Sequence, residues 1–300
     1  MRLLILVAAL FLSACSASVQ DTGDTGVPLA PLAPVSAGTC PDLSTPGGVV
    51  FDVNGVSRTA YVYFPESKPA NMPVVFFWHP LGATAAQIGR LIHAQTLADS
   101  QEMIFVLPQA RPQEPYEWQF YMDDGGNDAT FYDDLRTCIV QQLGGDPMRV
   151  TSAGMSAGGL WSSWMTLHRS NTLATTLVMS GGTGEVVYYT SPETDLPVLV
   201  MWGGASDHFT IGSRTVNFDL QSRQFIDDLV TDGHFVVGCN HNQGHTIPID
   251  GISALPAWLL PHTYGQPSPF ADGGLAGLPS YCQVEDQPNL EDAATDTGGT

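Results

Sequence analysis

Positive charge is scarce in this chain of 300 residues. Lys68 is the only lysine, and lysine and arginine together number 10 against 30 acidic residues, which gives a formal net charge of -20. An acidic surface repels phosphate backbones and anionic headgroups, so we expect no nucleic-acid partner, although the charge is also explained by solubility alone. Charged residues make up only 13% and hydrophobic residues 43%, which is typical of a globular protein with one large domain.

Long apolar runs are also lacking. The run from Leu3 to Leu12 is shorter than the roughly 20 residues that span a bilayer. Because Arg2 precedes the run and small residues follow it, residues 1–14 are predicted to be a signal peptide. The ending Leu12-Ser13-Ala14-Cys15 resembles a bacterial lipobox, which implies cleavage before Cys15 and lipidation of its thiol.

This reading places the protein in the cell envelope, with a membrane contact through the lipid anchor only. Ser16 follows the cysteine, and by the sorting rule of some Gram-negative bacteria that residue favours the outer membrane. The alternative is an ordinary signal peptide and a secreted protein.

Cysteines are few and form no Cys-x-x-Cys pair, so a structural zinc site is not expected. If Cys15 carries lipid, four cysteines remain, and an even number in an oxidising compartment predicts two disulfides. Cys239 and Cys282 both fall in the C-terminal third and are favoured as one pair. That choice leaves Cys40 to pair with Cys138.

Both ends of the chain have low-complexity composition. Residues 15–42 are rich in Ala, Pro, Ser, Thr and Gly and are predicted to be a flexible tether, whereas residues 283–300 are predicted to be an acidic, disordered tail. Asp-Thr-Gly occurs three times in these ends, but an aspartic protease holds that motif in a buried turn, so linker composition explains it better. The catalytic domain is expected over residues 43–282.

Between these ends, strand-like and helix-like segments alternate. Asn54-Gly55 joins the first two strands and is a strong hairpin signal. Alternation of apolar strands with helices predicts an α/β fold, a mostly parallel sheet with helices on both faces and an antiparallel N-terminal hairpin at one edge. The expected strands are Val49–Val53, Ala60–Phe64, Pro73–Trp78, Met103–Leu107, Arg149–Ala153, Leu177–Met179, Val198–Trp202 and Phe235–Val237. The expected helices are Ala85–Ser100, Tyr132–Leu143, Gly158–His168, Val216–Val230 and Ile252–Leu260.

One short motif points to nucleophilic chemistry. Gly154-Met155-Ser156-Ala157-Gly158 fits Gly-x-Ser-x-Gly, with a predicted strand before it and a predicted helix after it. A nucleophilic serine needs such a sharp strand-to-helix turn, and the glycines allow strand and helix to approach closely. Ser156 is therefore the candidate nucleophile.

A serine hydroxyl needs a base, and the base needs an acid that orients it. Asp207 follows the predicted strand Val198–Trp202 and is the candidate acid, in preference to Asp195 and Asp219. His245 follows the last predicted strand beside a small residue and is the candidate base.

His241 lies in the same loop as His245 and is the weaker candidate for the base. The two histidines are four residues apart, but the segment lacks the Glu of His-Glu-x-x-His, so a metal helix is not expected. His208 is expected to line the pocket or to be exposed.

Acyl transfer also needs two hydrogen-bond donors for the developing oxyanion. One is expected to be the backbone N–H of Ala157, which follows the nucleophile. The second should come from the loop after Trp78, where Leu81 is preferred and Gly82 remains possible. Pro80 has no N–H and is excluded.

These pieces resemble the α/β-hydrolase esterase family of polyhydroxybutyrate depolymerases and feruloyl or acetyl-xylan esterases, especially its bacterial lipoprotein members. The resemblance covers about residues 43–265 and implies hydrolysis of carboxylic esters through an acyl-enzyme, without metal or cofactor. It transfers roles to Ser156, Asp207, His245 and the amides of Leu81 and Ala157. The matching segments are His79-Pro80-Leu81-Gly82, Tyr132-Asp133-Asp134-Leu135, Asp146-Pro147-Met148-Arg149-Val150, Gly154-Met155-Ser156-Ala157-Gly158-Gly159, Gly203-Gly204-Ala205-Ser206-Asp207 and Gly244-His245.

Many relatives have Gly where Pro80 stands, which leaves the second oxyanion donor open. The expected substrates are feruloyl or acetyl esters of polysaccharide, or short hydroxyalkanoate esters. The alternatives are a catalytically inactive, surface-displayed binding protein on the same scaffold, and a serine peptidase of the same fold.

Aromatic residues near the predicted site are candidates for substrate contact. Trp78, Trp118 and Trp202 are named for this role because they lie near predicted strand ends or in the 110–129 loop, although core packing is the common role of tryptophan. The acidic residues from Asp123 to Asp128 do not have the spacing of an EF-hand, so a loop that caps a helix is expected there instead of calcium.

Overall fold

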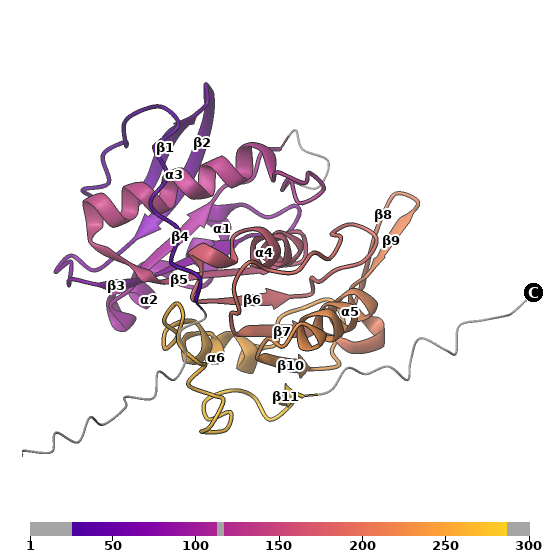
Figure 1. Cartoon of the computed structure of the whole chain (residues 1–300). Coiled ribbons are helices and arrows are strands. Elements are labelled where there is room, and N and C mark those ends of the chain that lie inside the picture. The colour runs from indigo at the N-terminus through magenta and orange to yellow at the C-terminus, as the bar shows by residue number, and fades with distance from the viewer. Residues whose placement is uncertain (1–25, 113–116, 287–300) are drawn as a thin grey trace, which may run out of the picture.

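The computed structural model describes residues 26–112 and 117–286, and its centre is a twisted sheet of nine strands (Figure 1). The strand order is β1-β2-β4-β3-β5-β6-β7-β10-β11, and the six strands from β4 to β10 run parallel. The edges are antiparallel: β1 and β2 form the predicted hairpin, and β11 pairs with β10. The strands are β1 (Gly47–Val53), β2 (Val56–Tyr63), β3 (Met72–Trp78), β4 (Ile104–Pro108), β5 (Gly145–Met155), β6 (Thr175–Met179), β7 (Val198–Trp202), β10 (Val236–Asn240) and β11 (Cys282–Glu285).

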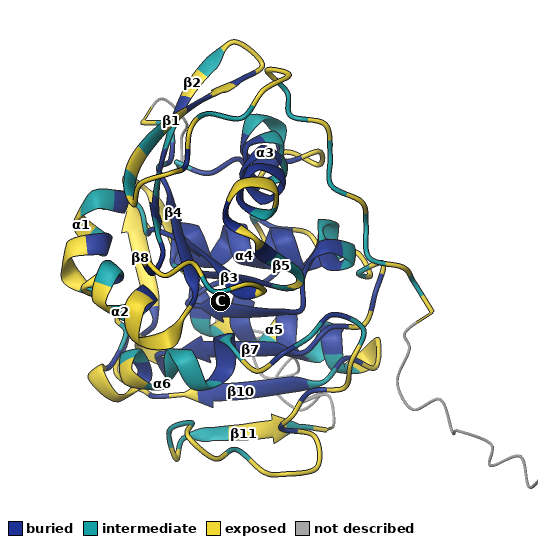
Figure 2. Cartoon of the chain, turned by 90° about the vertical axis from the view of Figure 1, so that its left-hand side faces the viewer, coloured by how far each residue is buried: buried dark blue, intermediate teal, exposed yellow. Residues whose placement is uncertain are grey.

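Helices cover both faces of the sheet, as the alternation of segments predicted. The central strands are buried on both sides, so they carry continuous apolar runs, and Figure 2 shows them buried between the helices. In β3 the side chains alternate: Phe76 and Trp78 belong to the core under one set of helices, and Val75 and Phe77 to the core under the other. The first set is α3 (Gly126–Leu143), α4 (Ala157–His168) and α5 (Phe218–Thr231), and the second is α1 (Ala85–Leu91), α2 (Ala94–Gln101) and α6 (Ile249–Leu259).

Two elements differ from the sequence prediction. The helix expected over Ala85–Ser100 is broken into α1 and α2, because His93 adopts a left-handed conformation with φ of 51°. A two-stranded hairpin, β8 (His208–Ile211) and β9 (Arg214–Asn217), precedes α5. The helix therefore begins after Asn217, whose side chain accepts a hydrogen bond from the Leu220 N–H.

The segment from residue 27 to 42 is docked on α3, so the predicted tether over residues 15–42 is wrong for this part. The amino-acid composition of this segment could not predict the docking, because the contacts are made by its backbone carbonyls, which every sequence has. The Arg136 guanidinium donates to the Ala30 carbonyl at 2.9 Å, and the Thr137 hydroxyl donates to the Ala33 carbonyl at 2.8 Å. Residues 1–25, with the predicted signal peptide and Cys15, lie outside the described residues.

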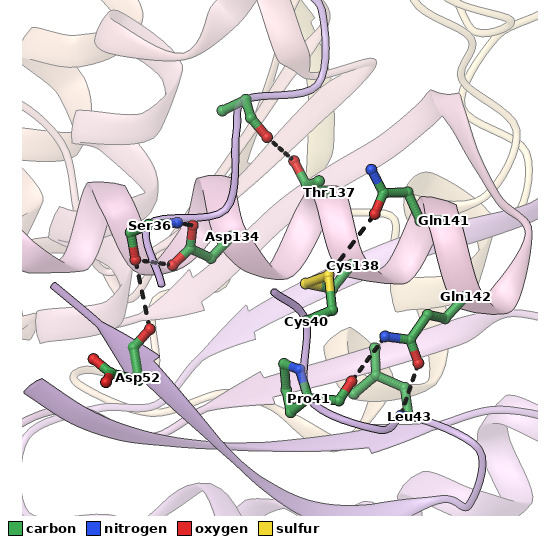
Figure 3. Close-up of a disulfide and its surroundings, with 11 residues drawn as sticks. Ser36, Cys40, Pro41, Leu43, Asp52, Asp134, Thr137, Cys138, Gln141 and Gln142 are labelled. Atoms are coloured by element: carbon green, nitrogen blue, oxygen red, sulfur yellow. Dashed lines mark hydrogen bonds between the residues drawn. A yellow bond between two sulfur atoms is a disulfide. The ribbon is translucent and has the colours of Figure 1, made fainter. Parts of the chain in front are cut away.

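A disulfide fixes the end of this docked segment. Cys40 is joined to Cys138 on α3, and the neighbouring Ser36 and Leu43 donate backbone N–H groups to side chains of the same helix (Figure 3). The second disulfide joins Cys239 of β10 to Cys282 of β11. Both pairs are those favoured from the sequence.

Removal of the first disulfide should weaken the whole fold. The bond closes a loop with a sequence separation of 98 residues, and loss of a native disulfide typically lowers the free energy of unfolding by about 2–5 kcal/mol. We expect the Cys40→Ser/Cys138→Ser double variant to unfold at a clearly lower temperature than the wild type in a calorimetric scan. An equal unfolding temperature under oxidising conditions would show that this disulfide adds nothing to stability.

The C-terminal prediction also needs a correction. Residues 283–285, assigned to the disordered tail, belong to β11, and Val284 pairs with Val237 of β10. Residues 287–300 lie outside the described residues. Within residues 26–112 and 117–286, no helix combines the length and apolar character that crossing a membrane requires.

Candidate active site

Ser156 occupies the turn between β5 and α4 in a strained conformation. Its φ of 57° and ψ of -119° are unusual for a residue with a side chain, and its N–H donates to the Met179 carbonyl of the neighbouring strand at 2.9 Å. The flanking glycines are required by space: a Cβ on Gly154 would collide with the Gly158 carbonyl, and a Cβ on Gly158 would collide with the Trp78 carbonyl. The turn thus holds the hydroxyl at the carboxyl end of the parallel strands.

His245 lies directly beside this hydroxyl. Its Nε2 is 2.9 Å from the Ser156 Oγ, and its Nδ1 is 2.7 Å from an oxygen of Asp207. The ring stacks on Phe218, with centroids 4.7 Å apart and an angle of 15° between the planes. Stacking and two hydrogen bonds leave the imidazole one orientation, in which it can accept the serine proton.

Asp207 is fully buried in the turn after β7. Its second oxygen accepts hydrogen bonds from the Ser180 hydroxyl and from the Gly203 N–H, both at 2.8 Å. Burial raises the pKa of Asp207, but the hydrogen bonds from His245, Gly203 and Ser180 outweigh it and bring the pKa below the ordinary value. The carboxylate is therefore ionised at neutral pH.

Ser180 was missed by the sequence analysis. It follows the buried strand β6, so its position at the carboxyl edge of the sheet was the available signal.

The loop that carries Asp207 and the loop that carries His245 are hydrogen-bonded to each other. The Gly244 N–H donates to the Gly203 carbonyl at 2.9 Å, and a Cβ on Gly203 would collide with the Gly244 carbonyl. His241 lies in the same loop, where its Nδ1 accepts from the Gln243 N–H, and the structure brings His245 to Ser156 instead. His208 is exposed on β8.

The residues proposed for the oxyanion lie on two neighbouring segments. Ala157 is the first residue of α4, so its N–H has no acceptor within the helix. The loop from His79 to Ala83 abuts the start of this helix, because a Cβ on Gly158 would collide with the carbonyls of Trp78 and His79. The Gly82 N–H donates to a carboxylate oxygen of Glu117 at 3.1 Å, whereas Leu81 is half-buried and its N–H has no hydrogen-bond partner within the described residues.

Comparison with known proteins supports this architecture. No family model matches the chain. Feruloyl esterase D of Neurospora crassa is 28% identical over 183 residues, which are 54% of this chain and 61% of that protein, so the match spans less than two thirds of the relative.

Solved structures share the fold over more of the chain. The protein called pOPH has a TM-score of 0.66 at 18% identity and covers 82% of this chain and 96% of its own. A ferulic acid esterase has a TM-score of 0.54 at 19% identity, and the match covers 72% of this chain and 95% of that protein. The chain has the α/β-hydrolase fold.

The three tryptophans predicted to contact substrate are core residues, and that prediction is wrong for them. Trp78 and Trp118 are 0% exposed, and their ring N–H groups donate to the Ser152 hydroxyl and the His79 carbonyl. Trp202 is 6% exposed and donates to Asp219. The rings of Trp118 and Trp161 pack against the ring of Trp78, so these tryptophans fill the interior.

Apolar surface beside His245 comes from the unpredicted β8–β9 hairpin instead. Phe209 on β8 is 40% exposed, and its ring lies 5.6 Å from that of His245. Ile211 is 37% exposed and follows Phe209 by two residues, so both side chains are on the same face of the hairpin. This face is available to an apolar group of a bound molecule.

The first turn of α3, at the end of the acidic segment over residues 123–128, has a structural role. Asp128 is buried and ion-paired with Arg58 at 2.6 Å, and Asn127 accepts from the same guanidinium at 2.7 Å. Among the residues that the structure describes, no group of three or more His, Cys, Asp and Glu side chains is placed to hold a metal ion.

Proposed function

We propose that this α/β-hydrolase cleaves carboxylic esters, with Ser156 as nucleophile, His245 as general base and acid, and Asp207 as the group that orients the imidazole. The observation that carries the proposal is the continuous line of hydrogen bonds from the Ser156 hydroxyl through His245 to buried Asp207. A hydroxyl, an imidazole and a carboxylate in this order are the elements of acyl transfer by serine hydrolases.

The proposed reaction has two halves. Ser156 Oγ attacks the ester carbonyl carbon while its proton passes to Nε2 of His245, and the carbonyl oxygen becomes an oxyanion. When the carbon–oxygen bond to the alcohol breaks, His245 returns the proton to the leaving alcohol, and an acyl-enzyme remains. Water then attacks the acyl carbon in the same way, losing a proton to His245, and that proton returns to Ser156 as the acid leaves.

Asp207 keeps its negative charge throughout this proposed cycle. It accepts a hydrogen bond from the Nδ1–H of His245, which leaves Nε2 free to act as base, and its charge stabilises the imidazolium that forms. Its depressed pKa favours this role, because a protonated carboxyl would no longer accept from Nδ1.

For substrates we propose feruloyl or acetyl esters of polysaccharide, or short hydroxyalkanoate esters. The relationship to a protein named feruloyl esterase supports the first class. The apolar face of Phe209 and Ile211 beside His245 is suited to contact an aromatic or aliphatic group next to the ester.

We further propose that the protein is exported, either anchored through lipid on Cys15 to the outer membrane or cell surface, or secreted. Residues 1–14 serve as the signal peptide in this proposal, and residues 43–282 form most of the catalytic domain. The two disulfides support export, because such bonds persist in oxidising compartments.

A substrate panel with a covalent probe tests the reaction class. A fluorophosphonate should label Ser156, and the protein should hydrolyse p-nitrophenyl acetate together with at least one of methyl ferulate, acetylated xylan and hydroxybutyrate oligomers. A p-nitroanilide should be hydrolysed far more slowly. Faster turnover of the anilide would point to a peptidase, and an unlabelled protein without turnover would point to a binding protein.

A further inference from the structure

The loop between β3 and α1 is held by a carboxylate from a distant segment. One oxygen of Glu117 accepts a hydrogen bond from the Gly82 N–H at 3.1 Å. The second oxygen lies 3.4 Å from His79 Nδ1, and the Glu117 side chain is only 18% exposed. Two residues of the loop that follows β3 thus face one carboxylate.

Hydrogen bonds fix the imidazole ring of His79 in one neutral tautomer. Its Nε2 accepts from the Ala110 N–H at 3.1 Å, so the ring proton is on Nδ1, from which it donates to the Pro80 carbonyl at 3.0 Å. Burial lowers the pKa of His79, which favours the neutral ring. The histidine therefore serves as a rigid support between the Ala110 backbone and the loop.

Backbone strain marks the same place. Glu117 has a φ of 69°, which residues with side chains adopt rarely, and the next residue, Trp118, donates its ring N–H to the His79 carbonyl at 2.9 Å. The start of α4 packs against the carbonyl of the same histidine. A strained residue is thus held where it can set the position of the loop relative to Ser156.

We propose that Glu117 is a positioning residue for the oxyanion site: it engages the Gly82 amide, fixes the loop against α4, and leaves the Leu81 N–H as the second oxyanion donor beside that of Ala157. The inference rests on the proposed esterase function. The Ala83 N–H is also engaged, by the Pro80 carbonyl at 3.1 Å, and Pro80 has no N–H. Leu81 then remains as the amide of this loop without a partner among the described residues.

Two variants of Glu117 test the proposal against p-nitrophenyl acetate. Glu117→Ala should lower kcat by about 10- to 100-fold, less than the roughly 10²- to 10³-fold loss seen when a donor is removed outright, because the loop is displaced but keeps its amides. KM should change by less than about threefold, since the oxyanion forms only in the transition state. Glu117→Gln keeps an oxygen for the Gly82 N–H and should recover most of the lost kcat.

A transition-state analogue separates positioning from general damage. A trifluoromethyl ketone forms an oxyanion on Ser156, so Glu117→Ala should weaken its inhibition by the same factor as kcat. Asp123→Ala, which removes an exposed carboxylate six residues further along the chain, is the matched control and should leave kcat and inhibition unchanged.

Two results would overturn the role proposed for Glu117. The first is an active wild type together with a folded Glu117→Ala variant whose kcat is unchanged or increased. The second is a loss of kcat and of inhibition in Asp123→Ala that equals the loss in Glu117→Ala. If Glu117→Ala does not fold, Glu117→Met decides, because it fills the same space but offers no oxygen to the Gly82 N–H. Weaker inhibition by the ketone with retained KM supports positioning, and wild-type values for both refute it. An inactive wild type would instead contradict the proposed function itself.

Discussion

Replacement of Ser156 by alanine should abolish ester hydrolysis, with kcat for p-nitrophenyl acetate reduced by about 10⁴-fold or more. In the proposed mechanism the Ser156 Oγ bonds to the acyl carbon, and no other hydroxyl hydrogen-bonds His245 within residues 26–112 and 117–286. The variant should fold, because alanine removes one oxygen from a turn that packing already determines. A stopped assay together with circular dichroism measures both properties.

The control for this variant is Ser163→Ala. Ser163 lies on α4, the helix that follows Ser156. Its buried hydroxyl donates to the Gly159 carbonyl and accepts from the Gly182 N–H, and it makes no hydrogen bond to His245. It should lose some stability and keep most of its kcat. Wild-type turnover by Ser156→Ala would contradict the mechanism, and equal loss in both variants would attribute the effect to folding.

Asp207→Asn should lower kcat by about 10⁴-fold while leaving the geometry of the site nearly unchanged. An amide can present its NH₂ to Nδ1, which forces the ring proton onto Nε2, and Nε2 can then no longer accept the proton of Ser156. The loss should be seen mainly in kcat, because the side chain is buried and cannot touch substrate. Steady-state kinetics on the folded variant measures it.

The pH dependence of stability gives a second measurement on the same residue. Because the folded pKa of Asp207 is lowered, its stabilising contribution is present above the ordinary pKa of about 3.9 and is lost as pH falls through the folded pKa. The wild type should therefore lose its stability advantage over Asp207→Asn in acid.

The control for the activity measurement is Asp195→Asn. Asp195 is an exposed residue that the sequence analysis also considered for the acid, and its variant should match the wild type in kcat. A loss of kcat comparable to that of Asp207→Asn would contradict the assignment of Asp207.

The fold and the three proposed catalytic positions followed from local patterns in the sequence. Apolar runs define the parallel strands, and the glycines around Ser156 are required by close backbone approach, which leaves a readable motif. Asp207 and His245 follow the ends of strands, and a parallel sheet brings such positions to one edge. Chain order and topology therefore carried most of the prediction.

The features that the sequence did not predict depend on contacts between residues far apart in the chain or on the burial of a side chain, and neither is visible in a local sequence pattern. Ser180 and Glu117 meet their partners across 27 and 35 residues of chain, through sheet order and loop packing. The exposed β8–β9 hairpin lacks the buried face that makes a strand visible as an apolar pattern. A tryptophan at a strand end looks the same in sequence whether it fills the core, as Trp78 does, or lines a pocket.

The docked segment on α3 has a consequence for which way the proposed active site faces. The Val27 carbonyl accepts from the Tyr264 hydroxyl, and the Ala30 N–H donates to the Asn171 carbonyl just beyond the far end of α4 from Ser156. That helix has 12 residues, so the chain joins the domain about 18 Å along the helix axis from the nucleophile.

Residues 16–26 separate the proposed anchor at Cys15 from Val27 and reach at most about 40 Å when fully extended. If Cys15 is anchored as proposed, the chain would enter the domain near the end of α4 opposite to Ser156, so attachment to a lipid surface would leave the nucleophile uncovered. Esters on extracellular polymers would then be within reach.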